Sequence, residues 1–194
     1  MLFVVVNLAI LANCRADDLA IEHFGSTNYG GWTIAGTAFG SGPTSGAQLA
    51  QIGIGNARDN QVLSSEQDGD GPTGTLVSPE FKIARKYISF LISGGDYEHE
   101  TCLNLLIDGK IVKSATGWRS DRLVPAGWDV SRWYGRKAQI QIVDAASGDW
   151  GHINVDQIVQ TDKPERLPIA TGPLYQETLR PQFHLPRASG RWTG

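Results

Sequence analysis

Strand signals dominate the chain after residue 20, and in several segments hydrophobic and polar residues alternate with a period of two. Such alternation places the apolar side chains on one face, as in half-buried β-strands. In 103–115 an alternating run reaches Asp108-Gly109, a dipeptide typical of a type I′ turn, and a second strand returns from Lys110. The inward positions predicted from the alternation are Ile88, Phe90 and Ile92, then Leu103, Leu105 and Ile107, then Ala138, Ile140 and Ile142, and finally Ile153, Val155 and Val159.

Many short strands separated by turn residues predict an all-β fold, an antiparallel β-sandwich of jelly-roll type. No segment has the period of an amphipathic helix, and one short helical turn is expected at 129–135, capped by Asp129 or Ser131. The predicted sandwich domain covers residues 20–161. A Pro-rich stretch without periodicity, 162–173, predicts a linker, and a basic, aromatic tail follows at 174–194.

The first residues differ from the rest of the chain. Residues 2–11 are an apolar run too short to span a bilayer, and Ala16 is a suitable last residue before cleavage. Residues 1–16 are therefore predicted to be a signal peptide, although no Lys or Arg precedes the apolar run. A lipid anchor at Cys14 and a buried strand are the alternatives. A signal peptide predicts a secreted or periplasmic protein.

Composition narrows the possible functions. The 194 residues include 23 Gly and six Trp, charged residues make up 19%, and the net charge is −3. Net acidity argues against nucleic acid as a partner. If cleavage follows Ala16, Cys102 is the only cysteine left, so a hydrophobic core and no intrachain disulfide must hold the domain. Cys102 is expected to be buried and inert.

Polar residues in two segments are candidates for binding a metal. Asp68 and Asp70 lie close together in a Gly-rich loop that suits calcium, or that is simply a solvated turn. His152, Asn154 and Asp156 alternate along one strand and so share a face. They suit a metal or a sugar, but we favour a structural role in satisfying backbone groups of a neighbouring segment. No nucleophile motif accompanies them.

Tryptophans are the candidates for binding sugar. Aromatic rings stack on the apolar faces of sugars while nearby polar groups bind the hydroxyls. The predicted sugar-binding residues are Trp118, Trp128 and Trp150, which lie in Gly-rich or polar connections, as does Trp133. The alternative is that these rings anchor the core or rim of the sandwich.

The tail resembles a known family. Arg180, Pro181, Phe183 and His184 in LRPQFHLP match the lead-in to the catalytic propeller of family 32 glycoside hydrolases, which include levanases, inulinases and invertases. The segments YGGWTIAGTAFG, GTLVSPEFKI, YISFLISGG, CLNLLIDGKIV and INVDQIV are similar, in order, to the β-sandwich that precedes this propeller in levanase-like proteins.

The resemblance implies an accessory domain. The family's nucleophile motif, Trp-Met-Asn-Asp-Pro-Asn-Gly, should follow, but 189–194 reads SGRWTG, so the resemblance assigns no catalytic residue to this chain. Residues 174–194 are therefore expected to be the truncated start of the catalytic propeller. We expect a non-catalytic domain that binds fructan or another polysaccharide, or that braces the catalytic domain of the same protein. The alternatives are β-fructosidase activity and a purely structural sandwich. No membrane partner and no cofactor are expected, apart from calcium as an option.

Overall fold

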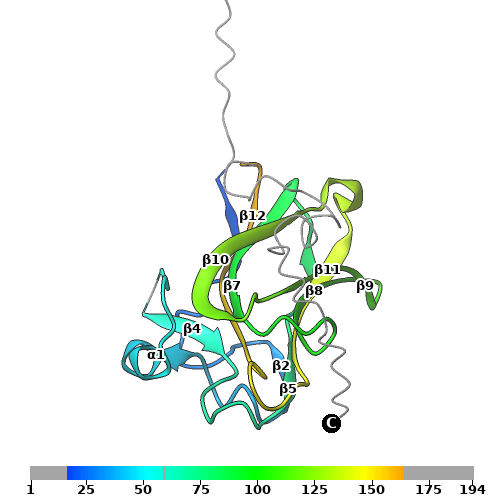
Figure 1. Cartoon of the computed structure of the whole chain (residues 1–194). Helices are drawn as coiled ribbons and strands as arrows, with labels where there is room; N and C mark the ends of the chain where they lie inside the picture. Colours follow the sequence, from blue (N-terminus) through cyan, green and yellow to red (C-terminus); the bar gives the residue numbers. More distant parts are fainter. Residues whose placement is uncertain (1–16, 59, 164–194) are drawn as a thin grey trace, which may run out of the picture.

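Short β-strands make up nearly half of the described part of the chain, residues 17–58 and 60–163 of the computed structural model, and almost all of its regular secondary structure (Figure 1). The elements are β1 (Leu19–Glu22), β2 (Thr33–Gly36), β3 (Thr44–Ser45), α1 (Gly46–Ile52), β4 (Gln61–Ser64), β5 (Gly74–Val77), β6 (Phe81–Lys82), β7 (Tyr87–Gly94), β8 (Thr101–Ile107), β9 (Lys110–Thr116), β10 (Ser120–Asp129), the 3-10 turn η1 (Ser131–Trp133), β11 (Lys137–Asp144) and β12 (Ile153–Thr161). The dominance of strands agrees with the alternating sequence pattern.

The strands form two sheets that pack as a sandwich. The first sheet has the order β10-β7-β12-β4-β3, with β1 also paired to β12. The second has the order β2-β5-β11-β8-β9, with β6 also paired to β11. All these pairs are antiparallel. The predicted antiparallel β-sandwich is confirmed.

The core lies between the sheets and is built from the predicted alternating positions. The predicted residues of β7, β8 and β11 all belong to one buried cluster. In β12 the prediction is right for Ile153 and Val155 but wrong for Val159, because the alternation is interrupted. Gln157 adds a residue to the strand, so Ile158 joins the core and Val159 turns to the outer face of the sheet.

Turn chemistry follows the sequence closely. Asp108 and Gly109 have φ values of 51° and 71°, as the predicted two-residue turn between β8 and β9 requires. The expected helical turn is η1, where the Asp129 carboxylate accepts the Ser131 N–H at 2.9 Å. Helix α1 was not expected. It has seven residues and buries only Leu49, so it leaves no periodic pattern in the sequence.

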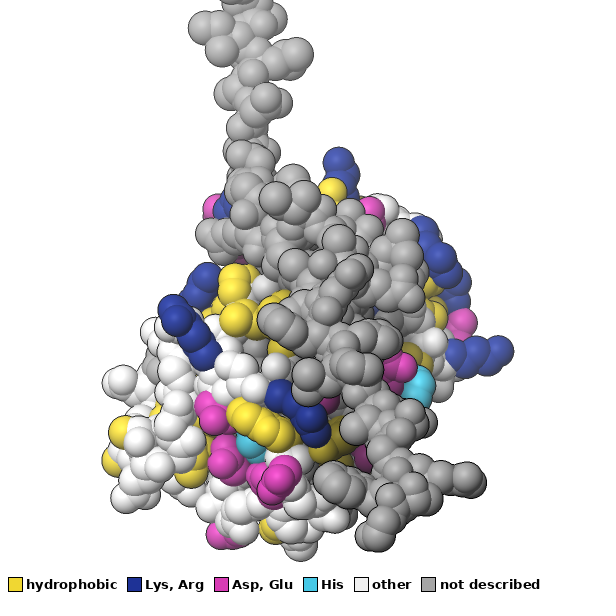
Figure 2. Space-filling view, in the orientation of Figure 1, with side chains coloured by type: hydrophobic (Ala, Val, Ile, Leu, Met, Phe, Trp, Pro, Cys, Tyr) yellow, Lys and Arg dark blue, Asp and Glu magenta, His cyan; other side chains and the backbone are white. Residues whose placement is uncertain are grey.

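Several expectations concern residues outside the described part of the chain. The signal peptide at 1–16, the tail at 174–194 and all but two residues of the linker fall there. Cys102 is fully buried, as expected, and burial raises the pKa of its thiol. Within the described ranges no helix has the length and apolar character needed to cross a membrane. On the face seen in Figure 2, Asp and Glu side chains gather beside a histidine low in the view.

Candidate functional site

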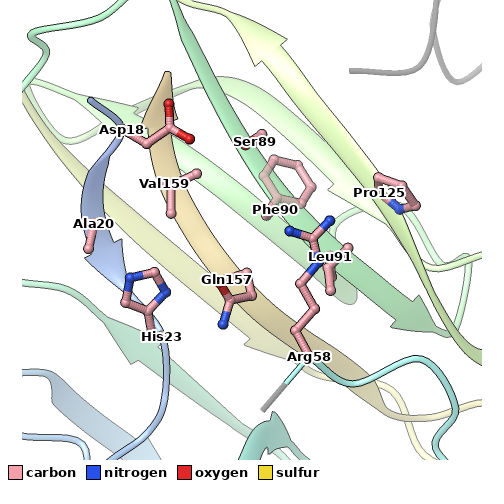
Figure 3. Close-up of a pocket in the computed structure, with 10 residues that line it drawn as sticks. All are labelled: Asp18, Ala20, His23, Arg58, Ser89, Phe90, Leu91, Pro125, Gln157 and Val159. Atoms are coloured by element: carbon pink, nitrogen blue, oxygen red, sulfur yellow. The ribbon is translucent and has the colours of Figure 1, made fainter. Parts of the chain in front are cut away.

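A groove of about 200 Å³ opens on the outer face of the first sheet, away from the core. Strands β7 and β12 form its floor, and β1, β10 and the segment after α1 form its sides (Figure 3). The residues that line it are Asp18, Ala20, His23, Arg58, Ser89, Phe90, Leu91, Pro125, Gln157 and Val159.

The groove exists because only part of this sheet face is covered. Helix α1 and the segment after it pack on the neighbouring part through a small apolar cluster. Gly55 bridges to Arg122 of β10, which fixes this cover to the sheet. The cover ends at Arg58, whose main-chain N–H donates to Asp156 Oδ2 at 3.2 Å. Beyond Arg58 the outward side chains of β7 and β12 are open to a ligand. The apolar cluster comprises Leu49, Ile54, Val62, Leu91 and Leu123.

A β-bulge shapes the floor of the groove. The pairing of β12 with β7 shifts between Asp156 and Val159, and Gln157 has a φ of 54°. A residue without the freedom of glycine is strained in this left-handed region, at a cost of about 1–3 kcal/mol. Bulges commonly turn a side chain toward a functional site. Here the bulge places both Asp156 and Gln157 on the outer face, and Gln157 lines the groove.

Several side chains that can form hydrogen bonds line the groove. In Figure 3 His23, Gln157 and Arg58 follow one another along one side, and Asp18 and Ser89 lie on the other. Asp18 accepts the Thr161 hydroxyl at 2.7 Å. The side chains of His23 and Arg58 are exposed and have no hydrogen bond within the described ranges. They are therefore free to donate to a ligand, above a floor of apolar side chains.

The three predicted sugar-binding tryptophans lie outside this groove. Trp128 is 6% exposed and packs on Phe90, with 4.6 Å between ring centroids, so it belongs to the core. Trp118 is half-buried against the same core. Trp150 is also half-buried, and its ring centroid lies 5.7 Å from that of His152.

The structure brings Trp118 and Trp150 to the same end of the sandwich. Arg119, the neighbour of Trp118, donates its N–H to the carbonyl of Gly94 at 2.9 Å. A Cβ on the next residue, Gly95, would collide with the carbonyl of Trp150. The two tryptophan segments therefore pack against the same pair of glycines, while Trp128 lies apart from them in the core.

A histidine surrounded by carboxylates lies at this end of the sandwich. His152 is 4% exposed, and its Nδ1 lies 2.7 Å from Asp70 Oδ1. Its Nε2 lies 3.2 Å from Asp121 Oδ1 and 3.6 Å from Glu66 Oε2. Burial is the main cause that raises the pKa of Glu66, and the charges of Asp121 and Asp70 raise it further. We call Glu66, Asp70, Asp121 and His152 the histidine cluster.

The other predicted polar residues have separate environments. Asp68 is exposed and is not part of the histidine cluster. Asn154 Nδ2 donates to Ser93 Oγ at 3.2 Å, and Asp156 accepts the Arg58 N–H. The structural role favoured for this strand therefore describes Asp156, which binds a backbone group of a neighbouring segment. His152 differs, because its ring faces side-chain carboxylates.

The polar residues of the groove were not predicted from the sequence. His23, Arg58 and Gln157 belong to no motif and are brought together by the pairing of β1 with β12 and by the cover that ends at Arg58. The one available indication was Gln157. In VDQIV two polar residues separate Val155 from Ile158, which breaks the period of two and indicates a bulge.

Comparisons with known proteins support the fold and a link to glycoside hydrolases. No protein-family model matches the chain. An Aspergillus rugulosus protein with the provisional name glycosyl hydrolase ecdE is 39% identical over 128 residues, which are 66% of this chain but 18% of the relative. The matched region thus spans less than a fifth of that relative.

Solved structures resemble the chain at the level of fold alone. The K2 cleaved adhesin domain of Lys-gingipain matches with a TM-score of 0.50 and 18% identity, over 75% of this chain and 99% of that domain. The carbohydrate-binding module TmCBM61, solved with β-1,4-galactotriose, matches with a TM-score of 0.46 and 14% identity, over 72% of this chain and 94% of that one. The second likeness is too distant to carry an argument about function.

Proposed function

We propose that this chain is a non-catalytic, carbohydrate-binding accessory domain of a protein related to glycosyl hydrolases. The observation that carries the proposal is the groove, in which His23, Arg58 and Gln157 surround an open apolar floor. The 39% identity to a protein named as a glycosyl hydrolase supports the carbohydrate connection.

The groove has the chemistry that a sugar requires. A sugar presents hydroxyl groups at its edge and C–H groups on its faces. Arg58 and Gln157 offer planar groups with several donors, and His23 adds a ring nitrogen. Ala20, Leu91, Pro125 and Val159 supply apolar surface on which C–H groups can lie.

The same groove lacks the chemistry that hydrolysis requires. Cleavage of a glycoside normally takes two carboxyl groups on either side of the scissile bond. Among the described residues that line the groove only Asp18 has a carboxylate, and it is bound to Thr161 and lies 3.4 Å from Lys163 Nζ. The carboxylates of the histidine cluster are no substitute, because the His152 ring fills the space between them.

The sequence resemblance supports a narrower proposal, in which the ligand is a fructan. The LRPQFHLP segment and the five sandwich segments are similar to levanase-like proteins of glycoside hydrolase family 32. Levan and inulin are therefore the first polysaccharides to test. In such a protein the catalytic domain would supply β-fructosidase activity, and this domain would hold the polymer near it.

A second candidate function is to brace a catalytic domain. It is favoured by the size difference from the relative, of which the matched region is only 18%. In that case the surface of the sandwich would contact the rest of the protein and no sugar. Binding measurements on the separate chain distinguish the two functions, because a brace needs no affinity for polysaccharide.

Affinity gel electrophoresis and calorimetry with levan, inulin, xylan and β-1,4-galactan test the proposal. We expect retardation by at least one polymer, and the Arg58→Ala variant should lose about tenfold in affinity, since a hydrogen bond from a charged group contributes about 1.5–3 kcal/mol. Arg132→Ala is the matched control, because Arg132 is exposed over Trp133 and lies outside the groove.

The remaining outcomes decide between the candidates. An unchanged affinity of the Arg58→Ala variant for the polymer would show that the sugar site lies outside the groove. Trp150→Ala would then test the opposite end of β12. No binding to any polymer would leave bracing as the function. Release of sugar from levan, inulin or sucrose by the purified chain would contradict a non-catalytic domain.

A further inference from the structure

The histidine cluster joins three separate parts of the chain at one end of the sandwich. Glu66 and Asp70 come from the loop between β4 and β5, Asp121 from β10, and His152 from the residue before β12. Asp70 is held in place on its other side, because its Oδ2 accepts the Trp150 N–H at 3.1 Å. The Asp70 carboxylate is thus positioned by the backbone as well as by the imidazole.

The cluster carries an excess of negative charge around a buried imidazole. Its three carboxylates surround one imidazole, and no Lys or Arg forms an ion pair with them within the described ranges. Taking a charge out of water is costly unless an opposite charge accompanies it. Glu66 Oε2 is buried and has no hydrogen-bond partner in this part of the structure. One imidazole carries at most one positive charge, so it cannot balance three carboxylates.

A fourth carboxylate points toward the cluster from the other sheet. Asp144 is 1% exposed and follows Ala138, Ile140 and Ile142 on the inward face of β11. Its side chain therefore points between the sheets, close enough to His152 and Asp70 to feel their charges. The Ser65 hydroxyl and Ala146 N–H are near it, yet among the described residues neither carboxylate oxygen has a hydrogen bond of normal geometry.

We propose that Glu66, Asp70 and His152 bind a divalent cation that accepts nitrogen as well as oxygen ligands, of the zinc or manganese class. One oxygen from each carboxylate and one ring nitrogen lie within 4.8 Å of one another, as ligands around a single ion must. With the ion at Nδ1, which faces Asp70, Asp121 holds Nε2, an arrangement that commonly orients a metal-binding histidine. Asp144 adds negative charge behind the ion.

The histidine distinguishes this site from a calcium loop. Calcium prefers six to eight oxygen ligands, whereas zinc binds imidazole and carboxylate readily with four ligands. The exposed Asp68, which a calcium loop would use, stands outside the cluster. A bound ion would link the loop between β4 and β5 to the start of β12, and so fix the segment that carries Trp150. This inference does not depend on the sugar-binding groove.

The test is metal binding by the purified chain after treatment with a chelator. Calorimetry and elemental analysis with zinc, manganese, calcium and magnesium chlorides should show one equivalent of zinc or manganese bound, with calcium at least tenfold weaker. Glu66→Gln and Asp70→Asn should each lower zinc affinity by at least tenfold. Asp68→Asn, a matched change in the same loop, should leave the affinity unchanged.

Cobalt(II) provides a spectroscopic measurement of the nitrogen ligand. The wild-type chain with cobalt should show visible absorption bands that disappear in the His152→Gln variant. Circular dichroism of each variant separates lost binding from lost folding, and Glu66→Gln keeps the inference testable if His152→Gln does not fold. Absence of stoichiometric metal in the wild type would overturn the inference. So would an equal loss in Asp68→Asn, or calcium binding that persists in His152→Gln.

Discussion

Strand β12 connects two very different polar regions, one at its start and one around its middle. At its start, His152 is buried and its two ring nitrogens face carboxylates of the same chain. Around Gln157, the groove presents His23 and Arg58 side chains that have no hydrogen bond within the described ranges. Buried polar groups require partners inside the protein or a bound ion, whereas exposed donors can bind water until a ligand replaces it. The two regions therefore suit a cation and a sugar, respectively.

Backbone conformation separates the same two regions. Beside the histidine cluster, Gly94 and Gly95 lie so close to the 150–153 segment that neither has room for a side chain. In the groove, by contrast, a residue with a side chain, Gln157, has a backbone φ that favours glycine. A strained residue is retained where its side chain has a use. Close packing governs the first region, and the proposed ligand contact would account for the strained residue in the second.

The largest effect on the free energy of unfolding is expected for Gly95→Ala. A Cβ there would collide with the Trp150 carbonyl and lie 2.7 Å from Thr101 Oγ1, so the start of β12 must move. We expect a loss of roughly 3 kcal/mol in the free energy of unfolding. Chemical denaturation measures it, with Gly25→Ala as control because Gly25 has no atom within 4 Å of the added Cβ. Equal stability of the two variants would show that the cluster end is loosely packed.

An intermediate effect is expected for Asp144→Asn, and it depends on pH. Burial raises the pKa of Asp144 from 3.8 to about 6. Because the folded chain holds this proton more tightly than the unfolded chain, Asp144 favours folding below pH 4 and loses that contribution as pH rises through 6. A shift of this size corresponds to at most about 3 kcal/mol.

The Asn variant should therefore be more stable than the wild type at pH 7 in the presence of a chelator, and the two should converge near pH 4. Urea denaturation at both pH values measures this difference. Saturating zinc should reduce the advantage of the variant, because the ion compensates the Asp144 charge. A variant that is less stable at pH 7 would show that the Asp144 carboxylate already has adequate partners.

Sequence patterns predicted the fold better than they predicted either region. Alternation identified the inward faces of β7, β8 and β11 because each residue's position depends only on its neighbours in the strand. Two of the four residues of the histidine cluster, Asp70 and His152, were already candidates from the sequence. Glu66 and Asp121 joined them only through the pairing of distant strands. The groove depends on where the cover by α1 stops, which no local pattern encodes.

The smallest effect is expected for Gln157→Gly, which tests whether the strain at the groove serves binding. Glycine adopts a φ of 54° without the cost that Gln157 bears, so the free energy of unfolding should rise by about 1 kcal/mol or less. Affinity for the polysaccharide should fall several-fold at the same time, because the amide leaves the groove. Thermal denaturation and affinity gels measure the two quantities on the same samples.

His99→Gly provides the matched control for this prediction. His99 has a φ of 70° and is exposed in the loop between β7 and β8, outside the groove. The His99→Gly variant should show a similarly small rise in the free energy of unfolding and keep full affinity for the polysaccharide. If both variants keep full affinity, Gln157 takes no part in binding and the bulge serves only to return Ile158 to the core. A loss confined to Gln157→Gly would instead show that β12 gives up stability at the groove in order to hold a ligand-binding side chain.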